Sequence, residues 1–134
     1  MNQPDFYLEM SVRDYECDLQ GVVNNAVYQN YLEHARHEYL KNIGINFAAL
    51  AAEGINLVVT RVEIDYKFPL RSGDRFVVEL APERISPVRM GFRQNIFRLP
   101  DRKEIVKALV TGTALNAKGR PQLPAALAAA LDRA

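Results

Sequence analysis

The positions of hydrophobic residues follow a helical period in one part of the chain and a strand period in others. Between residues 28 and 43, apolar residues recur at spacings of three and four, which predicts one apolar stripe along an amphipathic helix. Gly44 is expected to end this helix, and Asn46 to cap a short second helical turn over residues 47–53 that stops at Gly54. The stripe consists of Tyr28, Tyr31, Leu32, Ala35, Tyr39 and Ile43.

Alternation of apolar and polar residues predicts strands on both sides of the helical region. Residues 6–15 form the first, and a long strand after Gly54 ends at Pro69 and the Ser72-Gly73-Asp74 turn. Its inward face is expected to carry Val58, Val62, Ile64, Tyr66 and Phe68, with Thr60 among them. Three further strands are predicted over 75–84, 89–99 and 104–116, and a short terminal helix over 124–134.

This order of elements predicts an α+β fold in which a curved antiparallel sheet wraps around one long helix. Short turns favour antiparallel neighbours, and the helix must bury its stripe against the sheet. Such a sheet has an open edge, and open edges are usually covered by association. We therefore expect at least a dimer.

Composition narrows the class of protein. The 134 residues predict one domain, spanning residues 1–134, and the 49% hydrophobic and 25% charged residues are ordinary for a globular protein. A net charge of +1 gives no bulk reason to expect nucleic acid or an anionic membrane as a partner, and no apolar stretch is long enough to span a bilayer. The lone Cys17 excludes an internal disulfide, and the first ten residues lack a secretory pattern. We expect a cytoplasmic protein.

Candidate chemistry lies in the loop before the long helix. Asp18 stands a few residues ahead of the helix start, where unpaired backbone N–H groups and the positive helix dipole would polarise a carbonyl. The carboxylate could attack that carbonyl or activate a water. Gly21 allows a tight turn and a close approach to a ligand, and Asn24 or Asn25 suits the N-cap. An aspartate here can equally be a cap or a solvated turn residue.

Two segments carry a family resemblance. Residues 12–40, VRDYECDLQGVVNNAVYQNYLEHARHEYL, and residues 61–80, RVEIDYKFPLRSGDRFVVEL, resemble the 4-hydroxybenzoyl-CoA thioesterase / YbgC-like group of hotdog proteins. The chain looks closest to the plant acyl-lipid thioesterases of the methylketone-synthase type, through GVVNNAVY, RHE, IGIN and PLRSGD. The similarity extends over roughly residues 6–122.

The resemblance implies a hotdog fold, with a five-stranded antiparallel sheet around the helix, and subunits joined edge to edge into a dimer or tetramer. The substrate would be an acyl thioester of coenzyme A or acyl carrier protein, with a fatty-acyl or β-ketoacyl group. Asp18 matches the family's catalytic aspartate, as nucleophile or general base, with Gly21 in the same loop. Asn25 matches the position whose backbone N–H faces the thioester carbonyl. Many relatives carry His there, and an Asn side chain cannot act as a base.

Further site residues are expected if the substrate is such a thioester. Substrate contacts are expected from Val23, Asn24 and Tyr28 near the loop, from Glu33 further along the helix, and from phosphate-binding Arg71, Arg89 and Arg93. The tyrosines of the stripe also fit a core. His34 and His37 are too poorly placed for a metal, so we expect no metal and no cofactor. Two alternatives stay open: an acyl-thioester hydratase or dehydratase, and a non-catalytic module that binds acyl chains or a carrier protein.

Overall fold

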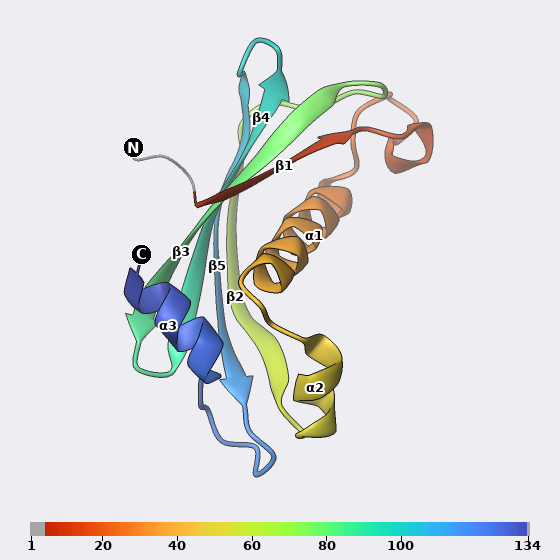
Figure 1. Ribbon diagram of the computed structural model, residues 1–134. Coiled ribbons are helices and arrows are strands. Elements are labelled where there is room, and N and C mark those ends of the chain that lie inside the picture. Colours follow the sequence, from red (N-terminus) through yellow and green to blue (C-terminus); the bar gives the residue numbers. More distant parts are fainter. Residues whose placement is uncertain (1–4, 134) are drawn as a thin grey trace.

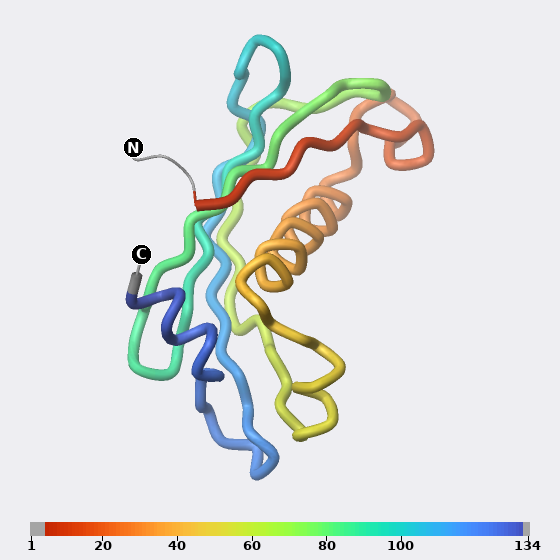
Figure 2. Tube along the Cα trace, in the orientation of Figure 1, coloured from red at the N-terminus to blue at the C-terminus, as the bar shows by residue number. Residues whose placement is uncertain are grey.

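The computed structural model describes residues 5–133, and its elements follow the predicted order (Figure 1). Their bounds are β1 (Phe6–Ser11), the 3₁₀ turn η1 (Asp14–Glu16), α1 (Asn25–Asn42), α2 (Phe47–Ala52), β2 (Asn56–Tyr66), β3 (Arg75–Ser86), β4 (Arg89–Leu99), β5 (Glu104–Leu115) and α3 (Ala125–Arg133). The path of the chain between them is clearest in Figure 2. The α+β class and the terminal helix are confirmed, although Ala134 lies outside the described residues.

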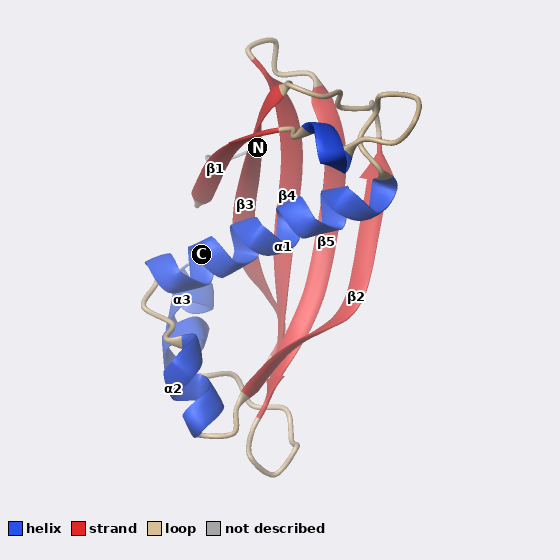
Figure 3. Ribbon diagram, turned by 90° about the vertical axis from the view of Figure 1, so that its right-hand side faces the viewer, coloured by secondary structure: helices blue, strands red, loops and turns tan. Residues whose placement is uncertain are grey.

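All strands belong to one antiparallel sheet in the order β1-β3-β4-β5-β2. The helix α1 crosses one face of this sheet, here called the inner face (Figure 3). The expectation that β2 and β3 are neighbours is wrong, since β2 pairs with β5 and β3 with β1. The connection between them crosses the end of the sheet, anchored by the fully buried Leu70. As a result β2 is an edge strand.

The inner face and α1 together bury the core. The predicted stripe is buried at Tyr28, Tyr31, Leu32, Ala35 and Tyr39, whereas Ile43 is half-buried at the end of the helix. One cluster surrounds the first half of α1 and packs it against Phe76, Val78 and Ile96. A second cluster joins the last turns of α1 to Leu80 and Phe92, and α3 adds Leu127 and Leu131. Burial of this surface is the main force that holds the helices on the sheet.

The first strand is shorter than predicted. It ends at Ser11 rather than residue 15, because the chain turns into η1. The Glu16 carboxylate accepts a hydrogen bond from the Arg13 backbone N–H at 2.8 Å, which satisfies a donor that a longer ladder would have used. This turn begins the path toward the Asp18 loop.

A β-bulge interrupts β2 at Thr60. The register with β5 shifts between Val59 and Arg61, so Val59 opposite Gly112 and Val62 opposite Val110 both face inward. The prediction that Val58 shares the inward face of Val62 is therefore wrong, because the extra residue reverses the alternation. Phe68, predicted on the same strand, lies beyond its end at Tyr66.

Helix ends fall where capping chemistry predicts them. Asn46 accepts a hydrogen bond from the Ala49 N–H at 3.0 Å through its side chain and so caps α2. Gly44 has φ +93°, a left-handed conformation that suits glycine and ends the α1 segment. Residues of α2 are not buried, in contrast to those of α1.

Substituting Gly112 with alanine should lower the free energy of unfolding by about 1–3 kcal/mol, because overpacking forces the backbone to move. A Cβ at Gly112 would lie 2.7 Å from the Val58 carbonyl oxygen of the bulged strand. Gly91→Ala is the matched control, since its Cβ would meet the Ile85 side chain, which can rotate away. Urea denaturation at fixed protein concentration measures both. Equal losses in the two variants would show that the β2 backbone has room to shift.

Candidate active site

The Asp18 loop is organised by the Asp18 side chain itself. Its Oδ1 accepts hydrogen bonds from the Gln20 N–H at 2.9 Å and the Val22 N–H at 3.3 Å. The Asp18 carbonyl accepts from the Gly21 N–H at 3.0 Å, and Gly21 has φ +80°. Aspartate commonly builds such local turns. Within residues 5–133, Oδ2 has no hydrogen-bond partner, which leaves one carboxylate oxygen open to solvent or substrate.

Both ends of this loop are fixed by backbone hydrogen bonds. Asp18 and Val22 are joined by an N–H to carbonyl bond of 2.9 Å across the loop. The Asn24 N–H donates to the Glu16 carbonyl at 3.1 Å, and the Val23 N–H donates to the Leu70 carbonyl at 2.9 Å. The loop therefore has a defined position relative to the start of α1 and to the β2–β3 connection.

The start of α1 leaves one N–H group open. Asn24 is the N-cap: its Oδ1 accepts from the Ala26 N–H at 3.0 Å, and its carbonyl accepts from the Val27 N–H at 2.9 Å. In the part of the chain that the structure describes, the Asn25 N–H has no hydrogen-bond partner. Unpaired donors at a helix start bind anionic or polarised oxygens. This group can therefore act as an oxyanion donor.

A small cavity of about 190 Å³ opens beside this N–H. Its wall comes from the loop, from the helix start and from the segment that follows β2. The residues that line it are Val22, Val23, Asn25, Tyr28, Tyr66, Lys67, Phe68 and Pro69. Asp18 does not line this cavity, but its Oδ1 accepts a hydrogen bond from the N–H of Val22, which does.

Two buried tyrosines attach α1 to the segments that flank the loop. The Tyr28 hydroxyl accepts a hydrogen bond from the Leu70 N–H at 2.9 Å, and the Tyr31 hydroxyl donates to Glu16 at 2.8 Å. Burial raises the pKa of both phenols above the ordinary value, and the Glu16 hydrogen bond raises that of Tyr31 further. Both hydroxyls therefore stay protonated at neutral pH and serve as structural donors or acceptors.

Cys17 precedes Asp18 but is poorly suited to be the nucleophile. Partial burial raises the pKa of its thiol, and the negative charges of Asp14 and Asp18 raise it further. A thiol needs a lowered pKa to be reactive at neutral pH. Asp18 is the better candidate for the attacking group.

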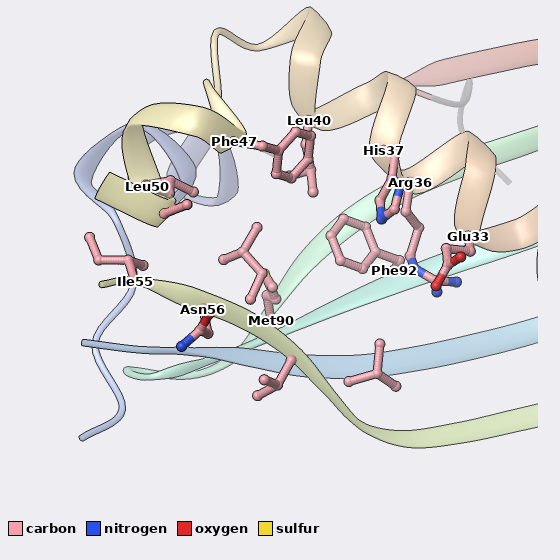
Figure 4. A pocket seen from close by; sticks show the side chains of 14 residues that line it. Glu33, Arg36, His37, Leu40, Phe47, Leu50, Ile55, Asn56, Met90 and Phe92 are labelled. Atoms are coloured by element: carbon pink, nitrogen blue, oxygen red, sulfur yellow. The ribbon is translucent and has the colours of Figure 1, made fainter. Parts of the chain in front are cut away.

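A larger cavity of about 490 Å³ lies between the second half of α1, α2 and the start of β2 (Figure 4). Most of its lining is apolar, with Leu40, Phe47, Leu57, Met90 and Phe92 among the contributors. The helix residues 33, 36 and 37 place a carboxylate, a guanidinium and an imidazole at one end. The cavity is therefore amphipathic.

Arg36 is held at that polar end by Gln94. The Arg36 guanidinium donates to Gln94 Oε1 at 3.1 Å, while the fully buried Gln94 donates through Nε2 to the Leu32 carbonyl at 2.9 Å. No carboxylate within the described chain lies within salt-bridge distance of Arg36. Burial lowers the pKa of this guanidinium, an effect that the charge of Glu33 partly opposes.

The structure brings only part of the predicted site together. Asp18, Gly21, Asn24 and Asn25 share the loop and helix start with the buried Val23 and Tyr28. Exposed Arg71 is nearby, because it bridges Val22. Glu33 lies about 12 Å further along α1, from eight residues at 1.5 Å each, and lines the larger cavity instead.

The other two predicted arginines lie elsewhere. Arg89 and Arg93 alternate with inward Met90 and Phe92 on β4, so their side chains leave the sheet on the face opposite α1. Arg93 pairs there with Glu83 at 3.0 Å. Neither lines either of the two cavities described above.

Sequence reasoning missed the residues that the end of β2 and the β2–β3 connection contribute. Tyr66, Lys67 and Phe68 reach the helix start only because β2 occupies the sheet edge beside β5. Their alternating apolar pattern gave no signal beyond a strand. Arg36 and Gln94, 58 residues apart in sequence, were likewise not identified as partners.

The two histidines on α1 contact different residues. His34 Nε2 lies 4.0 Å from Glu38, and the His37 ring packs against Phe47 with centroids 5.5 Å apart. Over residues 5–133, no group of three or more His, Cys, Asp or Glu side chains is arranged to hold a metal ion. No helix in the same range is long and apolar enough to cross a membrane.

The sequence and the fold match an established family. The thioesterase-like superfamily matches residues 12–131, and the chain belongs to this superfamily. Its fold is the predicted hotdog, as the solved structures show. A 1,4-dihydroxy-2-naphthoyl-CoA thioesterase from Synechocystis superposes with a TM-score of 0.89 at 19% identity over 95% of each chain, which concerns the fold alone. A protein from Aquifex aeolicus superposes with a TM-score of 0.85 at 28% identity, over 94% of this chain and 98% of that one.

Two relatives are similar to this chain over most of its length. The chain is 47% identical over 114 residues to the chloroplastic acyl-acyl carrier protein thioesterase ATL2 of Arabidopsis thaliana, covering 85% of this chain and 61% of the relative. It thus spans less than two thirds of the length of that plant protein. It is also 28% identical to the long-chain acyl-CoA thioesterase FadM of Escherichia coli, over 86% of both chains.

Asn24→Ala should lower the free energy of unfolding by about 1 kcal/mol, because it removes the side-chain cap of α1. Asn25→Ala is the matched control: its side chain has no hydrogen-bond partner among residues 5–133, and alanine suits the first helical turn. Urea denaturation of both variants gives the comparison. A loss at residue 25 as large as at residue 24 would contradict the assignment of the cap.

Proposed function

We propose that this chain hydrolyses acyl thioesters to a free acid and a thiol, acting as one hotdog domain. The observation that supports this most directly is the arrangement of Asp18 and Asn25. One carboxylate oxygen of Asp18 is held by loop N–H groups while the other is open, and the helix start beside the loop offers a free N–H. The loop and the helix start that follows it thereby offer the two requirements of thioester hydrolysis, an attacking group and a donor for the developing negative charge.

The reaction needs no other side-chain base. The thioester carbonyl would accept a hydrogen bond from the Asn25 N–H, which stabilises the oxyanion as the attacking oxygen bonds to carbon. If Asp18 attacks directly, an anhydride forms, the thiolate leaves, and water then releases the acid. If Asp18 acts as a base, it takes a proton from the attacking water, and that proton passes to the departing thiolate. Both routes give the same products, and both require an ionised Asp18.

The substrate we propose is a fatty-acyl or β-ketoacyl thioester of coenzyme A or acyl carrier protein. The names of the relatives cover both carriers, and the apolar part of the larger cavity suits an alkyl chain. Both cavities lie on the side of α1 that faces β2, against opposite ends of that strand. Arg71 is the one predicted phosphate-binding arginine that lies beside the loop.

A hydratase or dehydratase is less well supported. That chemistry normally needs a histidine next to the substrate carbonyl, and neither His34 nor His37 lines the cavity at the helix start. A module that binds acyl thioesters without hydrolysing them would show no loss of turnover when Asp18 is replaced. The experiment on Asp18 below therefore also tests this alternative.

We further propose that two copies join along β2. This strand has 11 residues, no described strand pairs with its outer edge, and its inward Val62 and Tyr66 are 40% and 46% exposed in a single subunit. Long apolar edges are normally covered. Pairing of two dimers into a tetramer, a cytoplasmic location, and the lack of nucleic-acid or membrane partners stay predictions from the sequence.

Asp18→Asn should lower kcat by about 10²–10⁴-fold with little change in substrate binding, since it keeps the shape and removes the charge and basicity. Asn25→Ala should cost far less, because its backbone N–H survives the substitution. Release of free thiol from acyl-CoA and acyl carrier protein thioesters measures both. Wild-type turnover in Asp18→Asn, or a larger loss in Asn25→Ala, would exclude the mechanism. Comparison of the two variants also distinguishes loss of the Asp18 carboxylate from a general disruption of the loop.

Val62→Lys should shift the protein toward a 15.1 kDa monomer, because it places a charge on the apolar edge that we expect to be covered. Glu63→Lys, on the adjacent outward-facing position, should leave the mass of the wild-type oligomer largely unchanged. Light scattering at micromolar concentration distinguishes the two. A wild-type protein that is already monomeric under these conditions is incompatible with the proposal.

A further inference from the structure

Two side chains form a wall between the larger cavity and a second one. Leu50 and Ile55 line the cavity of about 490 Å³, and both also line a neighbouring cavity of about 270 Å³. The second cavity lies toward the start of α3. Its other lining residues are Glu53, Asn116, Gln122, Leu123, Pro124 and Ala125.

The position of this wall is fixed by the end of α2. The Ile55 N–H donates to the Leu50 carbonyl at 2.9 Å, which holds the two residues together across the turn. Gly54 makes that turn with φ +73°, and a Cβ there would lie 3.2 Å from the Ala117 Cβ. The turn is therefore set against the segment that leads from β5 to α3, and the backbone of Leu50 and Ile55 is held in place.

The larger cavity has a charged end and an apolar end. Glu33 and Arg36 stand at one end, and Leu50 and Ile55 stand at the other, with Met90 and Phe92 between them (Figure 4). An acyl chain whose thioester lies at the Asn25 N–H would reach this cavity at its charged end, about 12 Å further along α1, with its terminal methyl toward the apolar end. The chain terminus would thus meet the wall.

We propose that Leu50 and Ile55 determine the longest acyl chain that the protein hydrolyses efficiently. This inference rests on the proposed thioesterase function. Chains that stop short of the wall gain apolar contact with each added methylene, whereas longer chains must displace the wall or bend. Beyond it, Leu123, Pro124 and Ala125 offer further apolar surface, and Asn116 and Gln122 are already bonded to each other at 3.0 Å. Opening the wall would therefore extend the usable space.

The direct test is a chain-length profile of kcat/KM over saturated acyl-CoA thioesters from hexanoyl to octadecanoyl. Each methylene buried in apolar surroundings contributes about fourfold, the equivalent of ~0.8 kcal/mol. Leu50→Ala should move the optimum to chains longer by two or more carbons. Relative to wild type, the longer substrates should gain about tenfold over the shorter ones. Ile55→Ala, which lies outside α2, should shift the profile in the same direction.

A substitution in the opposite direction guards against a simple loss of folding. Ala51 lines the larger cavity next to the wall, so Ala51→Leu should shorten the optimum by filling that end. Ala48→Leu adds the same side chain to the same helix at an exposed position that lines neither cavity, and it should leave the profile of wild type unchanged. Circular dichroism of each variant checks that it is folded.

Binding of S-alkyl-CoA thioethers, which cannot be hydrolysed, separates the two proposals. Calorimetry should show the same change in length preference in Leu50→Ala and Ala51→Leu as the kinetic profile. Thioether binding with this length dependence, but no hydrolysis by wild type, would overturn the proposed function and support the role of Leu50 and Ile55 in chain-length selection. Hydrolysis with the same chain-length profile in wild type, Leu50→Ala and Ala51→Leu would overturn the role of the wall and support the proposed function.

Discussion

The seating of α1 on the inner face of the sheet is the constraint on which the rest of the structure depends. Its apolar stripe decides which side of the helix faces the strands, but apolar contact is non-directional and would tolerate sliding. Directional bonds remove that freedom. Gln94 donates to the Leu32 carbonyl from within the core, and the hydroxyls of Tyr28 and Tyr31 bond segments on either side of the Asp18 loop. Each bond engages a group whose burial without a partner would be costly.

The same bonds make the helix start and the loop a single unit. Glu16 lies just before the loop and Leu70 follows β2, so the two tyrosines tie two separate parts of the chain to the first turns of α1. The Asn25 N–H is then held in a fixed relation to the Asp18 carboxylate. The geometry of the proposed site is a by-product of satisfying buried polar groups. The tyrosines are accordingly structural residues that stand next to the site.

Much of the fold could be predicted from periodicity and capping residues, and less of the site could. The stripe of α1, the Asn24 and Asn46 caps and the three later strands are local patterns, which a sequence shows directly. The edge position of β2 depends on pairing between distant segments, so Tyr66 and Lys67 were not assigned to the site. The Asp18 loop stands out by its motif, whereas residue type alone does not reveal the face of a strand, so the sequence could not show that Arg89 and Arg93 lie on the face opposite α1.

The bulge at Thr60 divides β2 into two parts with separate duties. Before it, residues 56–59 line the larger cavity, and after it, residues 61–66 form the longer uninterrupted part of the sheet edge. A bulge absorbs a change in register locally. Substitutions in the first part can therefore alter the cavity while the second part keeps its pairing. One strand can therefore change its cavity-lining part without changing the part that forms the edge of the sheet.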